Sequence, residues 1–178
     1  PVPVALRERI PALERVLALE PAYPRALASL GYTYATLGRP AAAIEQFRTA
    51  LRADPHDAVV LFDLAFVQQQ MGQHQEALQI FERASSVNPR LDRAWYGMGM
   101  SLRALGRHED ALKAFERAAV LQPMNGFAFY ELGMTYHALG HAAKVEEVLT
   151  HLSGFDPKLA NKLAHDSGLA ASATSGLR

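Results

Sequence analysis

The sequence predicts an all-α solenoid of stacked helical hairpins, and three regularities support this fold class. Proline recurs every 34 residues, at Pro21, Pro55, Pro89, Pro123 and Pro157. Glycine keeps the same period, at Gly38, Gly72, Gly106 and Gly140. Between these positions the apolar residues recur at steps of three and four, as on one face of a helix. This period is typical of a two-helix unit that buries its apolar face only against neighbouring copies of itself.

Four full copies follow one another, and they span residues 24–57, 58–91, 92–125 and 126–159. In each copy the first helix carries two large apolar residues three positions apart, followed at once by a small residue. The small residues are Gly31, Ala65, Gly99 and Gly133. A glycine inside a helix costs about 1 kcal/mol relative to alanine. We therefore expect the small residue to allow a close approach of the second helix, which offsets this cost.

Each copy also carries signals for the ends of its two helices. The periodic glycine is expected to supply the left-handed C-cap of the first helix. The second helix carries an alanine, phenylalanine, alanine stripe in three copies, as in Ala43, Phe47 and Ala50. The periodic proline ends the second helix, because the residue before a proline resists helical backbone angles. In the fourth copy the stripe changes to Val145, Leu149 and Leu152.

The segment before the first copy predicts half a repeat, over residues 10–23. We expect one helix over Pro11–Glu20, with Pro11 in its first turn, where a proline is tolerated. The apolar face of this helix carries Ile10, Leu13 and Leu17. Either it packs on the first full copy, or it meets a partner or an upstream repeat.

The segment after the fourth copy predicts a capping helix over Pro157–His165, within residues 157–166. Its apolar residues are expected to cover the end of the fourth copy, and its charged residues to face water. The apolar set is Leu159, Ala160 and Leu163, and the charged set is Lys158, Lys162 and Asp166. Residues 167–178 are small and polar, so we expect a flexible tail, which leaves a single domain over residues 1–166.

Composition excludes several classes of function. Lysine and arginine number 18, as do aspartate and glutamate, so the basic excess typical of nucleic-acid binding is missing. The chain has no cysteine, which excludes disulfides and leaves a cytoplasmic and a periplasmic location both open. The sequence contains no run of apolar residues long enough to span a membrane. The chain begins at Pro1 without methionine, so we expect a processed or excised piece of a longer protein.

The residues that recur at equivalent positions of the four copies resemble the tetratricopeptide repeat. The resemblance covers roughly residues 10 to 165. The resemblance is to bacterial domains of this family, and it implies a right-handed superhelix. In such a superhelix the first helices line the concave face. One departure is Gln68, which stands where the second copy would usually carry a tyrosine.

The resemblance also implies which residues line the concave face, namely those between the packing columns. We expect the partner-binding residues to be Arg25, Tyr32, Phe62, Phe66, Gln69, Arg93, Tyr96, Met100, Arg103, Phe127, Tyr130 and Met134. Aromatic and methionine side chains suit an adaptable apolar ligand, such as a helix or an extended segment. The alternative is that several of them bury themselves within a tight superhelix.

Certain cochaperone members of the family grip a C-terminal carboxylate with lysine, asparagine and arginine. The matching positions here hold Ala28, Tyr32, Asp63, Arg93 and Gly97, with a single cation among them. We therefore do not expect the chain to capture acidic chaperone tails. Arginines on this face are instead expected to pair with isolated acidic groups of a mostly apolar ligand; these are Arg25, Arg93 and Arg103.

The sequence carries no pattern that indicates catalysis. A glycine-rich phosphate loop and a nucleophile elbow are both missing. His137 and His141 are four residues apart, but Gly140 between them favours a solvated turn over a zinc site. We expect no enzymatic activity, no cofactor and no metal.

The favoured function is therefore a protein-interaction module, a scaffold or chaperone-like adaptor that binds a peptide or helical segment in an apolar groove. One alternative is a self-assembling scaffold, in which the half repeat of one chain docks on another. A second alternative is a targeting region of a larger enzyme, such as a transferase.

Overall fold

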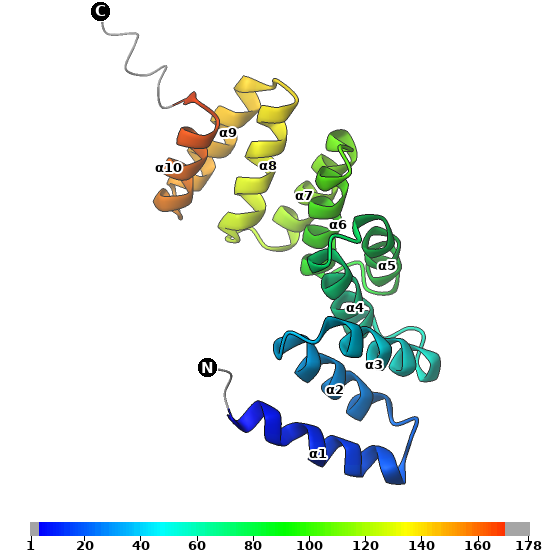
Figure 1. Cartoon of the computed structure of the whole chain (residues 1–178). Coiled ribbons are helices and arrows are strands. Elements are labelled where there is room, and N and C mark those ends of the chain that lie inside the picture. Colours follow the sequence, from blue (N-terminus) through cyan, green and yellow to red (C-terminus); the bar gives the residue numbers. More distant parts are fainter. Residues whose placement is uncertain (1–3, 170–178) are drawn as a thin grey trace, which may run out of the picture. The chain divides into compact units, whose positions relative to one another are not determined.

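The computed structural model describes residues 4–169, which form ten helices and no strand (Figure 1). In chain order these are α1 Val4–Leu19, α2 Pro24–Thr36, α3 Pro40–Ala53, α4 Ala58–Gln70, α5 His74–Val87, α6 Asp92–Ala104, α7 His108–Leu121, α8 Gly126–Ala138, α9 Ala142–Ser153 and α10 Pro157–Asp166. The all-α solenoid of stacked helical hairpins predicted from the sequence is confirmed. Contacts divide the chain into two compact units, Pro1–Gly97 and Met98–Arg178, with the boundary inside α6. The single domain over residues 1–166 stays a prediction.

The helices pair as the 34-residue period predicts, with α2, α4, α6 and α8 as first helices and α3, α5, α7 and α9 as second helices. The periodic glycines end the first helices with φ between 71° and 75°, which confirms the left-handed cap. Helix starts use local signals as well. The Asp57 carboxylate accepts hydrogen bonds from the amides of Val59 and Val60, at 2.9 and 3.0 Å.

Close packing of each second helix depends on the small residue of the first. A Cβ atom added to Gly31 would lie 2.7 Å from the ring of Phe47, which is fully buried. At Gly99 the same atom would lie 2.6 Å from the ring of Phe115. The expectation that the small residues permit close approach is therefore confirmed in both units.

The fourth repeat fills this space differently. The atom that a Cβ at Gly133 would meet belongs to Leu163 of α10, at 2.5 Å. Position 149 of α9 carries a leucine where the other repeats have phenylalanine, and Leu149 is only half-buried. Leu163 of the capping helix therefore occupies the space that a second-helix phenylalanine fills beside Gly31 and Gly99.

Helix α1 is longer than predicted. It begins at Val4, so Pro11 lies inside it, and the prediction that Pro11 occupies the first turn was wrong. An internal proline removes one hydrogen bond and costs about 3 kcal/mol. The added turns place Leu6 and Ile10, both half-buried, on one helix face, and their burial offsets part of that cost.

The apolar face of α1 is partly covered within unit 1, where Leu13 and Leu17 are half-buried. Helix α1 packs on α2 (Figure 1), and Leu17 contacts the buried core around Phe47. Packing of α1 on the first full copy, one of the two expected arrangements, is therefore observed. Leu19, at the end of α1, stays 87% exposed.

Helix α10 caps the chain as expected, with Ala160 and Leu163 buried. Ser167 is also buried, and Gly168, with φ of 75°, follows the helix. These residues are therefore part of the folded structure, whereas residues 170–178 of the predicted tail lie outside the described residues. Within residues 4–169 no helix has both the length and the apolar character needed to cross a membrane.

Gln68 is a weak point in the core. Its side chain is 2% exposed, and its Oε1 has no hydrogen-bond partner among the described residues. The equivalent position of the third repeat holds Leu102, which is also buried. Because an unsatisfied buried carbonyl is destabilising, Gln68→Leu should raise the free energy of unfolding by about 1–2 kcal/mol in urea denaturation.

The matched control is Gln70→Leu, an exposed glutamine at the end of the same helix, which should change stability little. A Gln68→Leu protein no more stable than this control would contradict the assignment of an unsatisfied carbonyl.

Candidate functional site

A pocket of about 600 Å³ lies between the first helices α2 and α4 of unit 1. We call it the first-junction pocket. Its walls include Tyr32, Ala35, Asp63, Phe66, Val67 and Met71. Tyr32 is 54% exposed and Phe66 45% exposed, although large aromatic side chains usually bury more of their surface. Two of the predicted partner-binding residues thus flank one cavity.

Other predicted residues of unit 1 form an aromatic cluster beside this pocket. The Phe62 ring stacks on Phe66, with ring centroids 5.9 Å apart and planes 21° apart. The Arg93 guanidinium lies 4.6 Å from the centroid of the Phe62 ring, within the range of a cation–π contact. The cluster therefore already positions three residues that the sequence placed on the binding face.

The remaining predicted residues of unit 1 differ in their exposure and in their contacts within the chain. Arg25 is exposed on α2, and Tyr96 is half-buried on α6. Gln69 donates a hydrogen bond from Nε2 to the carbonyl oxygen of Gly97, at 2.8 Å. Gln69 therefore links two first helices.

Asp63 is a residue of the site that sequence reasoning did not select. Asp63 lines the first-junction pocket, and its carboxyl accepts no hydrogen bond from the described residues. Burial raises the pKa of Asp63 from 3.8 to about 6, against the opposing charge of Arg93 and with a smaller contribution from Asp57. The same position of the fourth repeat also holds an acid, Glu131, and this recurrence was the signal that could have identified it.

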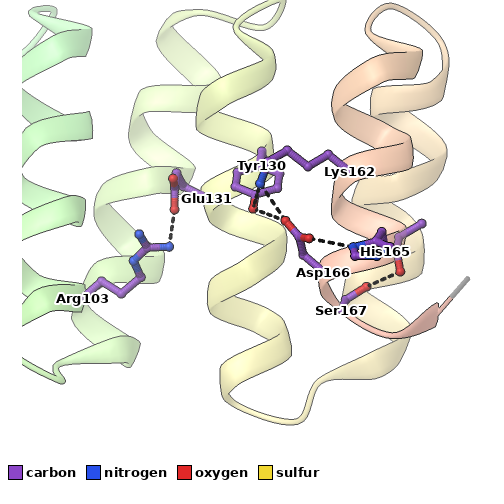
Figure 2. A network of polar contacts seen from close by, with 8 residues as sticks. Arg103, Tyr130, Glu131, Lys162, His165, Asp166 and Ser167 are labelled. Carbon is purple, nitrogen blue, oxygen red and sulfur yellow. Dashed lines mark hydrogen bonds and ion pairs between the residues drawn. The ribbon is translucent and has the colours of Figure 1, made fainter.

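In unit 2 the predicted Arg103 is engaged within the chain. Its guanidinium forms an ion pair and a hydrogen bond with the Glu131 carboxylate (Figure 2). Met100 lies alongside, with its Sδ 3.9 Å from Arg103 Nη2. Burial raises the pKa of Glu131, and the charge of Arg103 opposes this rise. Arg103 is therefore less available to pair with an acidic group of a ligand than the sequence suggested, because its charge is already paired with Glu131.

Tyr130 is likewise held within unit 2, by the capping helix (Figure 2). Its hydroxyl donates to Asp166 Oδ2 at 2.6 Å and accepts from Lys162, whose Nζ lies 4.2 Å from the ring centroid. Hydrogen bonds from His165, Lys162 and Tyr130 hold the pKa of Asp166 below its ordinary value. Lys162 and Asp166 are exposed, as expected, but they also tie α10 to α8.

The other two predicted residues of α8 are less constrained. Phe127 is 64% exposed at the start of the helix, and Met134 is half-buried near its end. Among the described residues, no three histidine, aspartate or glutamate side chains are placed to hold a metal ion. Apolar contact is therefore the chemistry that these positions offer.

Two tetratricopeptide-repeat family models match the sequence, one over residues 34–100 and one over residues 92–125. The chain belongs to the tetratricopeptide-repeat family. Together the two matches cover residues 34–125, which contain α3 to α7 and the first-junction pocket's Asp63 and Phe66. No curated protein matches the sequence.

Several solved tetratricopeptide-repeat structures are similar to this chain. YrrB, described as a TPR protein with an unusual peptide-binding site, is 26% identical, with a TM-score of 0.77 over 89% of this chain and 82% of its own. MamA from Desulfovibrio magneticus RS-1 is 20% identical, with a TM-score of 0.75 over 92% of this chain and 88% of its own. PilF from Pseudomonas aeruginosa is 20% identical, with a TM-score of 0.77 over 92% of this chain and 77% of its own. At such identities MamA and PilF establish the fold alone.

Burial of Asp63 predicts a particular pH dependence of stability. Because the pKa is higher in the folded chain than the ordinary 3.8, folding favours the protonated acid, and this contribution is lost as pH rises through about 6. Asp63→Asn should therefore become more stable relative to wild type between pH 4 and pH 7. We expect a gain of about 1–2 kcal/mol in urea denaturation, after allowance for partial exposure.

Asp110→Asn is the control. Hydrogen bonding from Arg107 lowers the pKa of Asp110 from 3.8, so its contribution to stability changes mainly below that pH, and between pH 4 and pH 7 the stability of this variant relative to wild type should change little. A stability difference between Asp63→Asn and wild type that is the same at pH 4 and pH 7 would contradict the assigned burial.

Proposed function

We propose that the chain binds a peptide or helical segment of a partner protein along its first helices, as a scaffold or chaperone-like adaptor. Membership of the tetratricopeptide-repeat family supports a protein-interaction module, since such proteins are generally non-catalytic scaffolds. The observation that carries the proposal is the exposure of Tyr32 and Phe66 on either side of the first-junction pocket. The peptide-binding site for which YrrB is described adds support by similarity.

The energy of binding would come mainly from apolar burial. Full burial of a phenylalanine side chain is worth about 1.5–3 kcal/mol, so covering the exposed half of Phe66 gives about 1 kcal/mol. A ligand side chain that enters the pocket would also contact Val67 and Met71. Methionine adapts its shape to different ligands, which suits the recognition of a segment rather than of one rigid surface.

A self-assembling scaffold is the second candidate. Val16 and Leu19 on α1 are exposed, at 39% and 87%, and they offer a second copy an apolar contact. Light scattering across a range of concentrations separates the two candidates, because the peptide-binding proposal needs no dimer. No observation within residues 4–169 favours a targeting region of a larger enzyme.

The test uses a peptide selected from a random dodecapeptide library on the wild-type protein. Phe66→Ser removes a pocket wall without adding charge, so the dissociation constant should rise about fivefold, a loss of about 1 kcal/mol. Isothermal titration calorimetry measures this constant directly.

Met124→Ser is the matched control, because Met124 is 71% exposed in the turn before α8 and lies outside the pocket. The affinity of the Met124→Ser protein for the selected peptide should stay within about twofold of wild type. Equal binding by the Phe66→Ser protein and by wild type would rule out the first helices of unit 1 as the binding face.

A further inference from the structure

Neighbouring first helices are linked by a polar contact that recurs along the chain. Between α4 and α6, Gln69 donates to the Gly97 carbonyl oxygen at 2.8 Å, across 28 residues of sequence. Between α6 and α8, Arg103 pairs with Glu131, also across 28 residues (Figure 2). The two contacts therefore use the same two positions of the repeat. At both of these junctions a long donor side chain reaches an acceptor on the next first helix.

The junction between α2 and α4 breaks this pattern. The same two positions hold Ala35 and Asp63, and both line the first-junction pocket. Alanine has no donor and cannot reach the acid. The cavity of about 600 Å³ thus lies where Gln69 or Arg103 stands at the other junctions. Asp63 provides an acceptor, as Glu131 does, but no side chain on the neighbouring first helix donates a hydrogen bond to it.

Arg93 does not take the place of the missing donor. It comes from α6 and is not among the residues that line the pocket, and its guanidinium lies over the Phe62 ring. Its charge acts on Asp63, but no hydrogen bond joins the two residues. A half-buried carboxylate without a hydrogen-bonded cation is costly, so a ligand that supplies one gains from removing that cost.

We propose that the first-junction pocket takes an arginine side chain of the bound peptide, whose guanidinium pairs with Asp63 as Arg103 pairs with Glu131. The alkyl part of this arginine lies along the walls formed by Tyr32 and Phe66. This inference rests on the proposed function and adds the chemistry of the ligand. The partner segment is therefore apolar with one basic residue.

Arginine fits this pocket better than lysine for two reasons. Its planar guanidinium can give a carboxylate two parallel hydrogen bonds, whereas an ammonium acts as a point charge. A guanidinium also stacks on aromatic rings, as Arg93 does on Phe62 in this chain. Both Tyr32 and Phe66 present exposed ring surface at the pocket.

The first test compares peptides selected from a random dodecapeptide library by wild type and by Asp63→Asn. Wild type should enrich arginine at one position, and replacement of that arginine by citrulline, a neutral isostere, should weaken binding at least tenfold. Asp63→Asn should select peptides without this arginine.

The outcomes separate this inference from the proposed function. Peptides that depend on Phe66 but show no preference for arginine would overturn the inference and leave the proposed function standing. Failure to select any peptide would overturn both.

The second test needs no ligand. Ala35→Arg recreates in the first junction the pair that Arg103 and Glu131 form in the third. It should raise the melting temperature above that of Ala35→Met, a control of similar length without charge, and the gain should vanish when Asp63→Asn is added. It should also weaken binding of the arginine peptide at least tenfold. An Ala35→Arg protein no more stable than Ala35→Met would show that the pocket does not accept a guanidinium.

Discussion

The packing of a second-helix ring on a small residue of the first helix is the constraint on which the rest of the structure depends. Phe47 and Phe115 are fully buried, and a methyl group on Gly31 or Gly99 would collide with their rings. In α2 and α6 one face of the first helix is therefore occupied by this contact. The side chains between the packing columns, such as Tyr32 and Phe66, are left for other contacts.

Because the hairpins repeat, the same positions meet at each junction between first helices, and single residues decide whether a junction is closed. Arg103 and Glu131 close one with an ion pair, and Gln69 closes another through the Gly97 carbonyl. Ala35 leaves the first junction open, with Asp63 at the pocket. A binding site can therefore arise in a regular fold by loss of an internal contact rather than by addition of a new element.

Much of this fold is predictable from the sequence, because its main signals are local. The positive φ of the periodic glycines and the burial of the alanine and phenylalanine stripe follow from spacing alone. Contacts between residues far apart in the sequence were harder to predict. Leu163 fills the space beside Gly133, and Lys162 and Asp166 hold Tyr130, because α10 folds back on α8. Asp63 was missed as a site residue because its importance depends on the missing donor at Ala35.

Binding at the first-junction pocket is tested by a nuclear magnetic resonance titration of the wild-type protein with its selected peptide. It locates the ligand by the residues whose signals shift. We expect the largest shifts at Tyr32, Asp63 and Phe66, around the first-junction pocket. Shifts centred on Met100 and Met134, with the first-junction signals unchanged, would contradict this expectation.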